Sequence, residues 1–312
     1  MTESATSLSK LRANVALAYR GESRAVDLVL TALLARGHVL IEDVPGVGKT
    51  TLARALGRSL SLDFRRIQFT SDTLPADVLG ISVFHAPSDR FEFHPGPIFA
   101  NIVLADEINR ATPKTQSALL EAMNESAVTV ESERRTLPQP FMVVATQNPV
   151  EYLGTYPLPE SQMDRFLLRL TLGYPDADEE KMLLRRGGTE RVLAAIPAVL
   201  GPTQVVALQQ ETENVAVSDR LLEYLHALVR ATRDTAELRL PVSTRGAQAL
   251  FRAVQAYALI QGRAYATPDD AQMLAEPVLA HRILSVSSDG FGAGGREREI
   301  VRRILTQVPV PL

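Results

Sequence analysis

Short apolar runs and longer amphipathic stretches alternate along the first 174 residues of the chain. Most of the short runs are apolar nearly throughout, as expected of parallel strands buried on both faces of a sheet, whereas residues 64–69 include two arginines and a glutamine. They predict strands at residues 39–41, 64–69, 102–106, 141–148 and 166–172. Before and between these strands, apolar side chains recur every three or four positions, which predicts amphipathic helices. These helices span residues 8–20, 22–36 and 112–124, and a further one opens at Lys49.

The pattern changes after Tyr174 and Pro175, beyond which the period is helical to the end of the chain. The predicted helices span residues 179–186, 203–212, 218–233, 244–261, 268–282 and 296–307. Ser218 and Thr267 stand at two of the predicted N-caps, and a proline follows Thr267 in the first turn. We therefore predict two domains, an α/β domain over residues 1–174 and an all-helical domain over residues 175–312.

Two stretches of the α/β half alternate with a period of two and predict β-hairpins inserted into loops. In the first, near residues 79–94, two strands flank the turn 85–89. In the second, near residues 126–138, the polar segment 131–134 separates the strands, so that the second strand should begin at Arg135. Long insertions in a compact domain are often functional. Ordinary surface turns would show the same pattern.

The apolar run 39–41 ends in a turn rich in proline and glycine, and Lys49 then opens a helix. In this strand–loop–helix context, glycines let backbone N–H groups curl round phosphate oxygens, and the helix directs its positive end at them. Lys49 would reach the β- and γ-phosphates of a nucleoside triphosphate, and the Thr50 hydroxyl would ligate Mg²⁺. The predicted nucleotide-binding residues are Asp43, Val44, Pro45, Gly46, Val47, Gly48, Lys49, Thr50 and Thr51. Asp43 departs from the strict P-loop pattern, which has glycine at that position.

Two acidic residues, Asp106 and Glu107, follow the apolar run that begins at Ile102. Ligands of open α/β sheets bind at the carboxyl ends of the strands, where Asp106 would hold Mg²⁺ and Glu107 would polarise the attacking water as general base. Asn148 ends the next predicted strand and could orient that water against the γ-phosphate. Carboxylates at a strand end can instead cap a helix, and an asparagine there can simply form a turn. A P-loop upstream favours the catalytic interpretation.

Composition excludes several other classes of function. The 312 residues contain no cysteine, which rules out disulfides, cysteine metal sites and thiol catalysis. A formal net charge of −3 gives no overall reason to expect nucleic acid or an anionic membrane as a partner. The start of the chain lacks the basic and apolar regions of a signal peptide, and no window approaches the roughly 18 apolar residues of a membrane span. We therefore expect a cytoplasmic protein with no membrane insertion.

Taken together, these motifs resemble the AAA+ ATPases, and within them the MoxR family. The family-like stretches are Glu42–Thr50, Arg66–Gly80, Pro95–Phe99, Leu104–Ala111, Ala145–Pro149 and Leu158–Phe166. The resemblance runs from about residue 20 to the C-terminus. It implies an α/β fold, with a P-loop AAA+ αβα core whose five-stranded parallel sheet has the order 5-1-4-3-2, followed by a small all-helical lid domain. In such a fold the loop 20–22 would lie beside the adenine, unless it is a plain helix–helix turn.

The resemblance also implies a role for each residue that matches a family motif. Lys49 and Thr50 match the Walker A motif, and Asp106 and Glu107 match the Walker B motif. Asn148 matches sensor 1. The cofactors implied are ATP and Mg²⁺.

Two arginines complete the set that the resemblance implies. Arg165 matches the arginine finger, which in the family completes the site of a neighbouring subunit. Arg245 matches sensor 2, which reaches from the lid to the γ-phosphate. The simpler alternatives are a surface salt bridge for Arg165 and an ordinary helix N-terminal arginine for Arg245.

The function implied is that of an ATPase that assembles as a homo-oligomer, a hexameric ring, and remodels or activates a client protein. In the family this role is chaperone-like, often with a partner carrying a von Willebrand factor A domain and often in metal-cofactor insertion. Both hairpins would project toward the ring pore. One alternative is a nucleotide-dependent regulatory module with slow hydrolysis, which the set of catalytic residues disfavours. Another is a DNA-acting or magnesium-chelatase-like motor, and the absence of a basic footprint disfavours a DNA-acting one.

Overall fold

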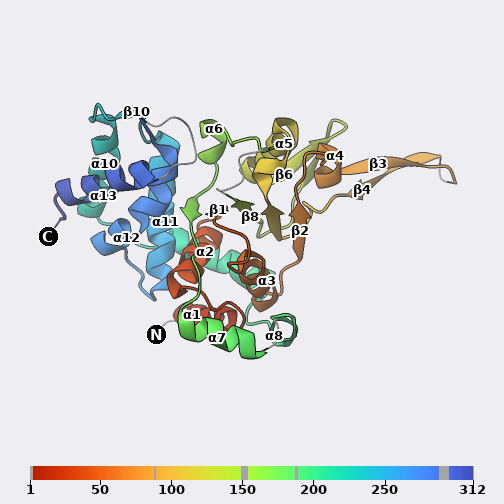
Figure 1. Cartoon of the computed structure of the whole chain (residues 1–312), viewed down its shortest axis with the longest axis horizontal. Coiled ribbons are helices and arrows are strands. Elements are labelled where there is room, and N and C mark those ends of the chain that lie inside the picture. The colour runs from red at the N-terminus through yellow and green to blue at the C-terminus, as the bar shows by residue number, and fades with distance from the viewer. Residues whose placement is uncertain (1–2, 88, 149–153, 187–188, 288–294, 312) are drawn as a thin grey trace.

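A five-stranded parallel sheet forms the centre of the N-terminal half of the molecule (Figure 1). The structure is a computed structural model that describes residues 3–87, 89–148, 154–186, 189–287 and 295–311. The strands are β1 (Val39–Glu42), β2 (Phe64–Gln68), β5 (Ile102–Asp106), β8 (Met142–Gln147) and β9 (Leu168–Leu170). Their order across the sheet is β2-β5-β8-β1-β9. Numbered along the chain, this is the order 5-1-4-3-2, and the prediction is confirmed.

Both faces of the inner strands β1, β5 and β8 are buried, as their continuous apolar runs predict, whereas the edge strand β2 exposes Arg65, Arg66 and Gln68. Alternate residues of β5 point to opposite sides, so Ile102 and Leu104 enter one hydrophobic core and Val103 and Ala105 enter the other. β9 is shorter than the predicted strand, because only Leu168–Leu170 pairs with β1. Pro149, the last residue of one family-like stretch, lies outside the described residues.

The long helices of this half are α1 (Glu3–Ala16), α2 (Ser23–Leu34), α3 (Lys49–Ser59) and α5 (Pro113–Glu125). Helix α1 begins and ends earlier than the predicted span 8–20. Its first residues are mostly polar, so the apolar period does not mark the true start. Tyr19 lies beyond the end of the helix but is buried, so its apolar side chain made the helical pattern seem longer than the helix is.

Several short elements were not predicted, because three to six residues are too few to show a period. They are α4 (Pro75–Leu79), α6 (Glu160–Met163), α8 (Glu190–Ala195) and the 3₁₀ turn η1 (Ile108–Arg110). A second 3₁₀ turn, η2 (Ala280–Arg282), forms the end of the predicted helix 268–282. Helix α7 (Ala177–Arg186) was predicted and begins slightly earlier. Helix α8 packs on α3, and the Val199 N–H donates to the Ser59 carbonyl at 2.7 Å. The chain beyond Pro175 therefore first lies against the sheet half, and a domain boundary at residue 174 remains a prediction.

The C-terminal half is mainly helical and lies on one side of the sheet (Figure 1). Its helices are α9 (Pro202–Glu213), α10 (Asp219–Arg233), α11 (Thr244–Ile260), α12 (Pro268–Leu279) and α13 (Gly295–Gln307). Ser218 caps α10, as predicted, by accepting the Leu221 N–H at 3.3 Å. The half is not entirely helical, because β10 (Leu238–Leu240) pairs antiparallel with β11 (Leu284–Ser285). Over the part of the chain that the structure describes, no helix has the length and apolar character of a membrane span.

The two halves share one hydrophobic core. Helix α2 packs against α11, and Leu33 of α2 and Leu250 of α11 are buried in the same cluster of apolar side chains. A second, smaller core fills the opposite face of the sheet beneath α5. The helical half is therefore attached to the face of the sheet that α2 covers.

Both predicted hairpins are present, and the first projects far beyond the rest of the molecule (Figure 1). It consists of β3 (Gly80–His85) and β4 (Arg90–Pro95); the second consists of β6 (Ala127–Val130) and β7 (Glu133–Thr136). Strand β7 begins earlier than the predicted Arg135. Glu131 and Ser132 both have positive φ, of 50° and 68°, and form a tight two-residue turn, which leaves Glu133 to pair with Val130.

His38 ties the start of β1 to two neighbouring elements. Its Nε2 donates to the carbonyl of Met123 at 2.9 Å, and its Nδ1 accepts the N–H of Val143 at 3.0 Å. This arrangement requires the neutral imidazole, because a protonated Nδ1 could not accept. Burial lowers the pKa of His38 to about 4, and the hydrogen bond to Met123 only partly opposes it.

We predict that His38 makes stability depend on pH between its unfolded and folded pKa values. The folded pKa is depressed, so as pH falls below about 6.5 the unfolded chain gains a proton that the folded chain resists. Relative to His38→Gln, the wild-type chain should lose about 2 kcal/mol of unfolding free energy between about pH 7 and pH 4.5. Denaturant unfolding of both chains at each pH measures this. A difference that stays constant with pH would contradict it.

Candidate functional site

The P-loop connects β1 to α3 and has the conformation of a phosphate cradle. Gly46 and Gly48 have φ of 90° and 93°, a region that favours glycine, and Gly48 is the N-cap of α3. The Lys49 ammonium donates to the carbonyl of Asp43 at 2.5 Å, back across the loop. Burial lowers the pKa of Lys49, while the carboxylates of Asp43, Asp106 and Glu107 act in the opposite direction. A cation is therefore held next to the two acids at the end of β5.

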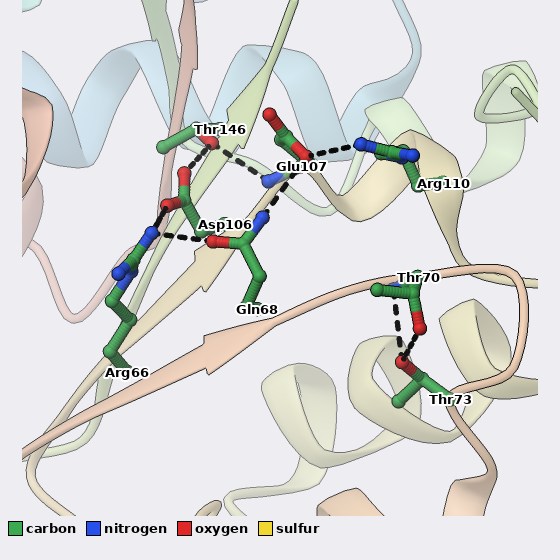
Figure 2. Close-up of polar contacts among 8 residues, drawn as sticks. All are labelled: Arg66, Gln68, Thr70, Thr73, Asp106, Glu107, Arg110 and Thr146. Carbon is green, nitrogen blue, oxygen red and sulfur yellow. Dashed lines mark hydrogen bonds and ion pairs between the residues drawn. The ribbon is translucent and has the colours of Figure 1, made fainter. Parts of the chain in front are cut away.

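Asp106 and Glu107 are held in place by Thr146, which lies on the neighbouring strand β8 (Figure 2). The Thr146 hydroxyl donates to Asp106 Oδ1 at 2.6 Å and accepts the backbone N–H of Glu107 at 2.9 Å. Glu107 has a φ of 56°, an uncommon value for a residue with a side chain. The Thr146 hydroxyl thus fixes the carboxylate of Asp106. It also fixes the backbone of Glu107, where the chain turns out of the sheet.

Strand β2 and the turn η1 supply further partners to the two acids. Arg66 donates to Asp106 Oδ2 through Nη2 at 2.6 Å and Nε at 3.1 Å. Gln68 Nε2 and Arg110 Nη1 both donate to Glu107 Oε2, at 3.0 and 3.2 Å (Figure 2). Sequence reasoning missed all three residues and Thr146. Arg66 and Gln68 could have been predicted from the sequence. They are two positions apart on one strand and therefore point to the same face, and the implied strand order places β2 beside β5.

These elements enclose one pocket. It is lined by Pro45, Gly46, Gly48, Lys49, Thr50, Thr51, Arg66, Gln68, Asp106, Glu107 and Asn148. The structure therefore brings together most of the predicted P-loop residues, both predicted acids and the predicted sensor 1 asparagine. Asp43, Val44 and Val47 are absent from the lining, and Val47 is buried in the hydrophobic core instead.

Asp43, the departure from the P-loop pattern, has structural partners. Its carboxylate accepts the backbone N–H groups of Leu172 and Gly173 at 2.7 and 2.8 Å, and that of Val44 at 2.8 Å. Glycine at this position would supply none of these acceptors. Asp43 therefore joins the start of the P-loop to the segment that follows β9.

A second pocket lies beside the first, between the α1–α2 loop and the segment after β9. Its lining includes Arg20, Gly21 and Glu22, the loop expected beside the adenine, and also Tyr19 and Tyr174. A side chain at Gly48 would meet the Tyr19 ring at 3.6 Å, so the Tyr19 ring, which lines this pocket, lies close to the P-loop. The Tyr19 hydroxyl is buried and has no hydrogen-bond partner among the described residues. Burial, followed by the charges of Glu22 and Asp43, raises the pKa of Tyr19 to about 12.

Arg165 and Arg245 do not line the P-loop pocket. Arg165 follows α6, and its Nη1 donates to the Leu120 carbonyl at 2.5 Å, in a separate pocket against α5. Arg245 lies in the first turn of α11. Burial lowers the pKa of Arg165, and the like charge of Arg245 adds to this effect, so the two arginines lie near each other. The structure thus separates this pair from the predicted catalytic residues of the same chain.

The oxygen-bearing residues of the P-loop pocket suit Mg²⁺. Thr50 offers a hydroxyl and Asp106 a carboxylate, and Mg²⁺ sites in nucleotide-binding proteins use one or two protein oxygens, with phosphates and water completing the octahedron. Across the described ranges, no group of three or more His, Cys, Asp or Glu side chains could hold a metal by itself. The pocket therefore fits a metal that arrives with a nucleotide.

Comparison with known proteins shows the family. Residues 38–168 match the family described as "ATPase family associated with various cellular activities (AAA)", and residues 230–304 match the "AAA lid domain". Chaperone MoxR1 of Mycobacterium tuberculosis is 37% identical over 300 residues, which cover 93% of this chain and 79% of that protein. The chain belongs to the MoxR family of AAA+ ATPases.

Two further proteins are similar over nearly the whole of this MoxR-family chain. The uncharacterized protein YeaC of Bacillus subtilis is 51% identical over 285 residues, covering 91% of this chain and 89% of that one. The crystal structure of a Cytophaga hutchinsonii protein, provisionally described as an ATPase, is 34% identical and superposes with a TM-score of 0.89. It covers 99% of this chain and 96% of its own. This chain therefore shares the α/β P-loop core and the helical lid with that structure.

We predict that Asp43→Ala destabilises the fold by about 1–3 kcal/mol, because two backbone N–H groups after β9 lose their charged acceptor. Asp43→Asn keeps one acceptor oxygen and should show a smaller loss. Denaturant unfolding of the three chains measures the effect. Equal stability of Asp43→Ala and the wild type would contradict the structural role of this carboxylate.

Proposed function

We propose that this MoxR-family chain binds ATP with Mg²⁺ and hydrolyses it to ADP and phosphate. The main support is that Lys49, Thr50, Asp106, Glu107 and Asn148 line one pocket. Lys49 offers a cation for the phosphates, and Thr50 and Asp106 offer oxygen ligands for a metal. Glu107 offers a general base, and Asn148 offers an amide that can orient water. A protein that only held a nucleotide would need neither the base nor the amide.

The P-loop and its helix would hold the triphosphate. Backbone N–H groups of the loop and the N-terminus of α3 face the phosphates, and Lys49 adds a full positive charge. Thr50 and Asp106 are the residues that would hold Mg²⁺, which, when bound, neutralises charge on the phosphate oxygens. The pocket lined by Tyr19 and Tyr174 is where we place the base and ribose.

Glu107 is arranged to accept a proton from the attacking water. Its two partners, Gln68 and Arg110, both donate to Oε2. Within the described part of the chain, Oε1 has no hydrogen-bond partner and can accept from a water that Asn148 helps to orient.

We place Arg165 in the site of a neighbouring subunit. It lies outside the P-loop pocket of its own chain, and its Nε is buried without a hydrogen-bond partner among the described residues. An arginine supplied in trans can raise a phosphoryl-transfer rate by about 10³–10⁵. We therefore propose that the chain assembles as a homo-oligomeric ring, a hexamer. In this ring, Arg245 of the lid would contribute to binding the γ-phosphate.

The client-binding surface that we propose is formed by the two hairpins. The first exposes Ile81, Phe84 and Phe91, and the two phenylalanine rings pack edge to face at 5.4 Å. Arg135 of the second hairpin lies 3.9 Å from the centre of the Phe93 ring of the first, so the two hairpins are in contact. An exposed apolar surface on a projecting element is suited to protein binding.

The client that we propose is another protein or protein complex. The name of the relative MoxR1 supports a chaperone-like role. We propose that the client is a cytoplasmic protein or complex that is remodelled or activated, with a von Willebrand factor A domain protein as partner. Insertion of a metal cofactor is one form that such activation takes. We propose no nucleic-acid partner, because the formal net charge of −3 gives no basic footprint.

One observation favours a second function, that of a nucleotide-dependent regulatory module with slow hydrolysis. Both acids of the pocket are paired with arginines of the same chain, Asp106 with Arg66 and Glu107 with Arg110. A site that kept these pairs with nucleotide bound would hydrolyse slowly. Turnover per subunit distinguishes the two functions.

We predict that Lys49→Ala and Glu107→Gln separate nucleotide binding from hydrolysis. The first removes a charged partner of the phosphates and should weaken ATP binding by about 10- to 100-fold. The second keeps the shape of the base but cannot take a proton, so hydrolysis should fall by about 10²- to 10⁴-fold while ATP still binds. Calorimetry and phosphate release measure the two effects. Unchanged ATP affinity in Lys49→Ala, or undiminished turnover in Glu107→Gln, would contradict the assigned roles.

We predict that Arg165→Ala leaves ATP binding near the wild-type value and stops hydrolysis, because the arginine acts on the neighbour. Mixing it with Glu107→Gln should restore part of the activity, since some interfaces then combine an intact base with an intact arginine. Phosphate release from the mixture, compared with each variant alone, measures this. No recovery under conditions where subunits exchange would count against a shared site.

A further inference from the structure

Arg66 is the cation that the structure places against the carboxylate proposed to hold the metal (Figure 2). Two of its nitrogens, Nη2 and Nε, donate to the same oxygen, Asp106 Oδ2, at 2.6 and 3.1 Å. The other oxygen, Oδ1, accepts the Thr146 hydroxyl at 2.6 Å. Both oxygens of Asp106 therefore already have hydrogen-bond donors.

A divalent cation and a guanidinium compete for such a carboxylate. Mg²⁺ binds a carboxylate oxygen directly or through its water shell, and either mode needs lone pairs that face the pocket. Oδ2 is the oxygen that faces Arg66, and Arg66 itself lines the pocket. We propose that Arg66 is a built-in competitor of the metal, which neutralises Asp106 until Mg²⁺ arrives with the nucleotide. This inference rests on the proposed function of the site.

The same arginine is linked to the general base through Gln68. Arg66 Nη2 also donates to Gln68 Oε1 at 2.5 Å, which fixes the orientation of that amide. The amide nitrogen then points to Glu107 Oε2 and donates at 3.0 Å. When Arg66 leaves Asp106, the amide loses the partner that orients it, and its hold on Glu107 weakens. Arrival of the metal is thereby coupled to release of the base.

The exposure of the two side chains makes this exchange feasible. The Arg66 side chain is 49% exposed, whereas that of Asp106 is 15% exposed. The long arginine side chain can therefore move into solvent at small cost, while the carboxylate stays in place on β5. A part-exposed ion pair is weak enough for a divalent cation to displace it.

Arg65 provides a matched control for Arg66. It is the neighbouring residue of β2, carries the same charge and pairs with Asp63 at 3.6 Å rather than with Asp106. Its side chain is 61% exposed. Arg65→Gln and Arg66→Gln thus change the net charge equally, on the same strand, and only one of them removes the competitor.

The test is a Mg²⁺ titration of the binding of a non-hydrolysable fluorescent ATP analogue to the full chain. In Arg66→Gln, half of the Mg²⁺-dependent gain in affinity should occur at about fivefold lower Mg²⁺ than in the wild type, which corresponds to about 1 kcal/mol. Arg65→Gln should match the wild type, and Arg66→Lys, a single point charge, should lie between them. Circular dichroism checks that each variant is folded.

The possible results separate this inference from the function on which it rests. If the wild type shows Mg²⁺-dependent binding but Arg66→Gln needs the same or more Mg²⁺, Arg66 is no competitor, and the proposed ATP site stands. An equal shift in Arg65→Gln would show a general charge effect and also overturn the inference. A wild-type chain that binds no nucleotide at any Mg²⁺ concentration would overturn both.

Discussion

The site depends on the parallel order of β5, β8 and β1 in one sheet. Because parallel strands end at the same edge, the order places the acids after β5, Thr146 and Asn148 at the end of β8, and the P-loop after β1 next to one another. The apolar residues of these strands fill cores on both faces and keep the register fixed. The carboxylates of Asp106 and Glu107 and the ammonium group of Lys49 thereby lie together at one edge of the sheet. Their opposite charges partly neutralise each other.

The structure shows a site whose charges are balanced within the chain. Lys49 donates across its own loop, Arg66 pairs with Asp106, and Arg110 pairs with Glu107. In the proposed reaction, Lys49 exchanges its loop carbonyl for a phosphate and Asp106 exchanges Arg66 for a metal, whereas Arg110 holds only Oε2 of Glu107 and leaves Oε1 to the water. Asp43 also joins the P-loop to Leu172 and Gly173, two residues that line the pocket beside Tyr19.

Much of this arrangement could be predicted from the sequence, because its main elements are continuous. The strand order, the P-loop helix at Lys49 and the acids after Ile102 follow from apolar runs and a resemblance carried by local motifs. The contacts of Arg66 and Gln68 were missed because they join residues about 40 positions apart across two strands. Boundaries were missed where a pattern gave no signal, as at the polar start of α1 and at the two-residue turn Glu131–Ser132.

The central claim is that this pocket hydrolyses ATP once a neighbouring subunit contributes Arg165. The most direct test is the hydrolysis rate per subunit over a wide range of protein concentration, with the oligomeric state measured at each point. The account predicts a rate that rises steeply as rings assemble and then levels off. A substantial rate that stays flat, in a chain shown by sizing to be monomeric, would contradict it.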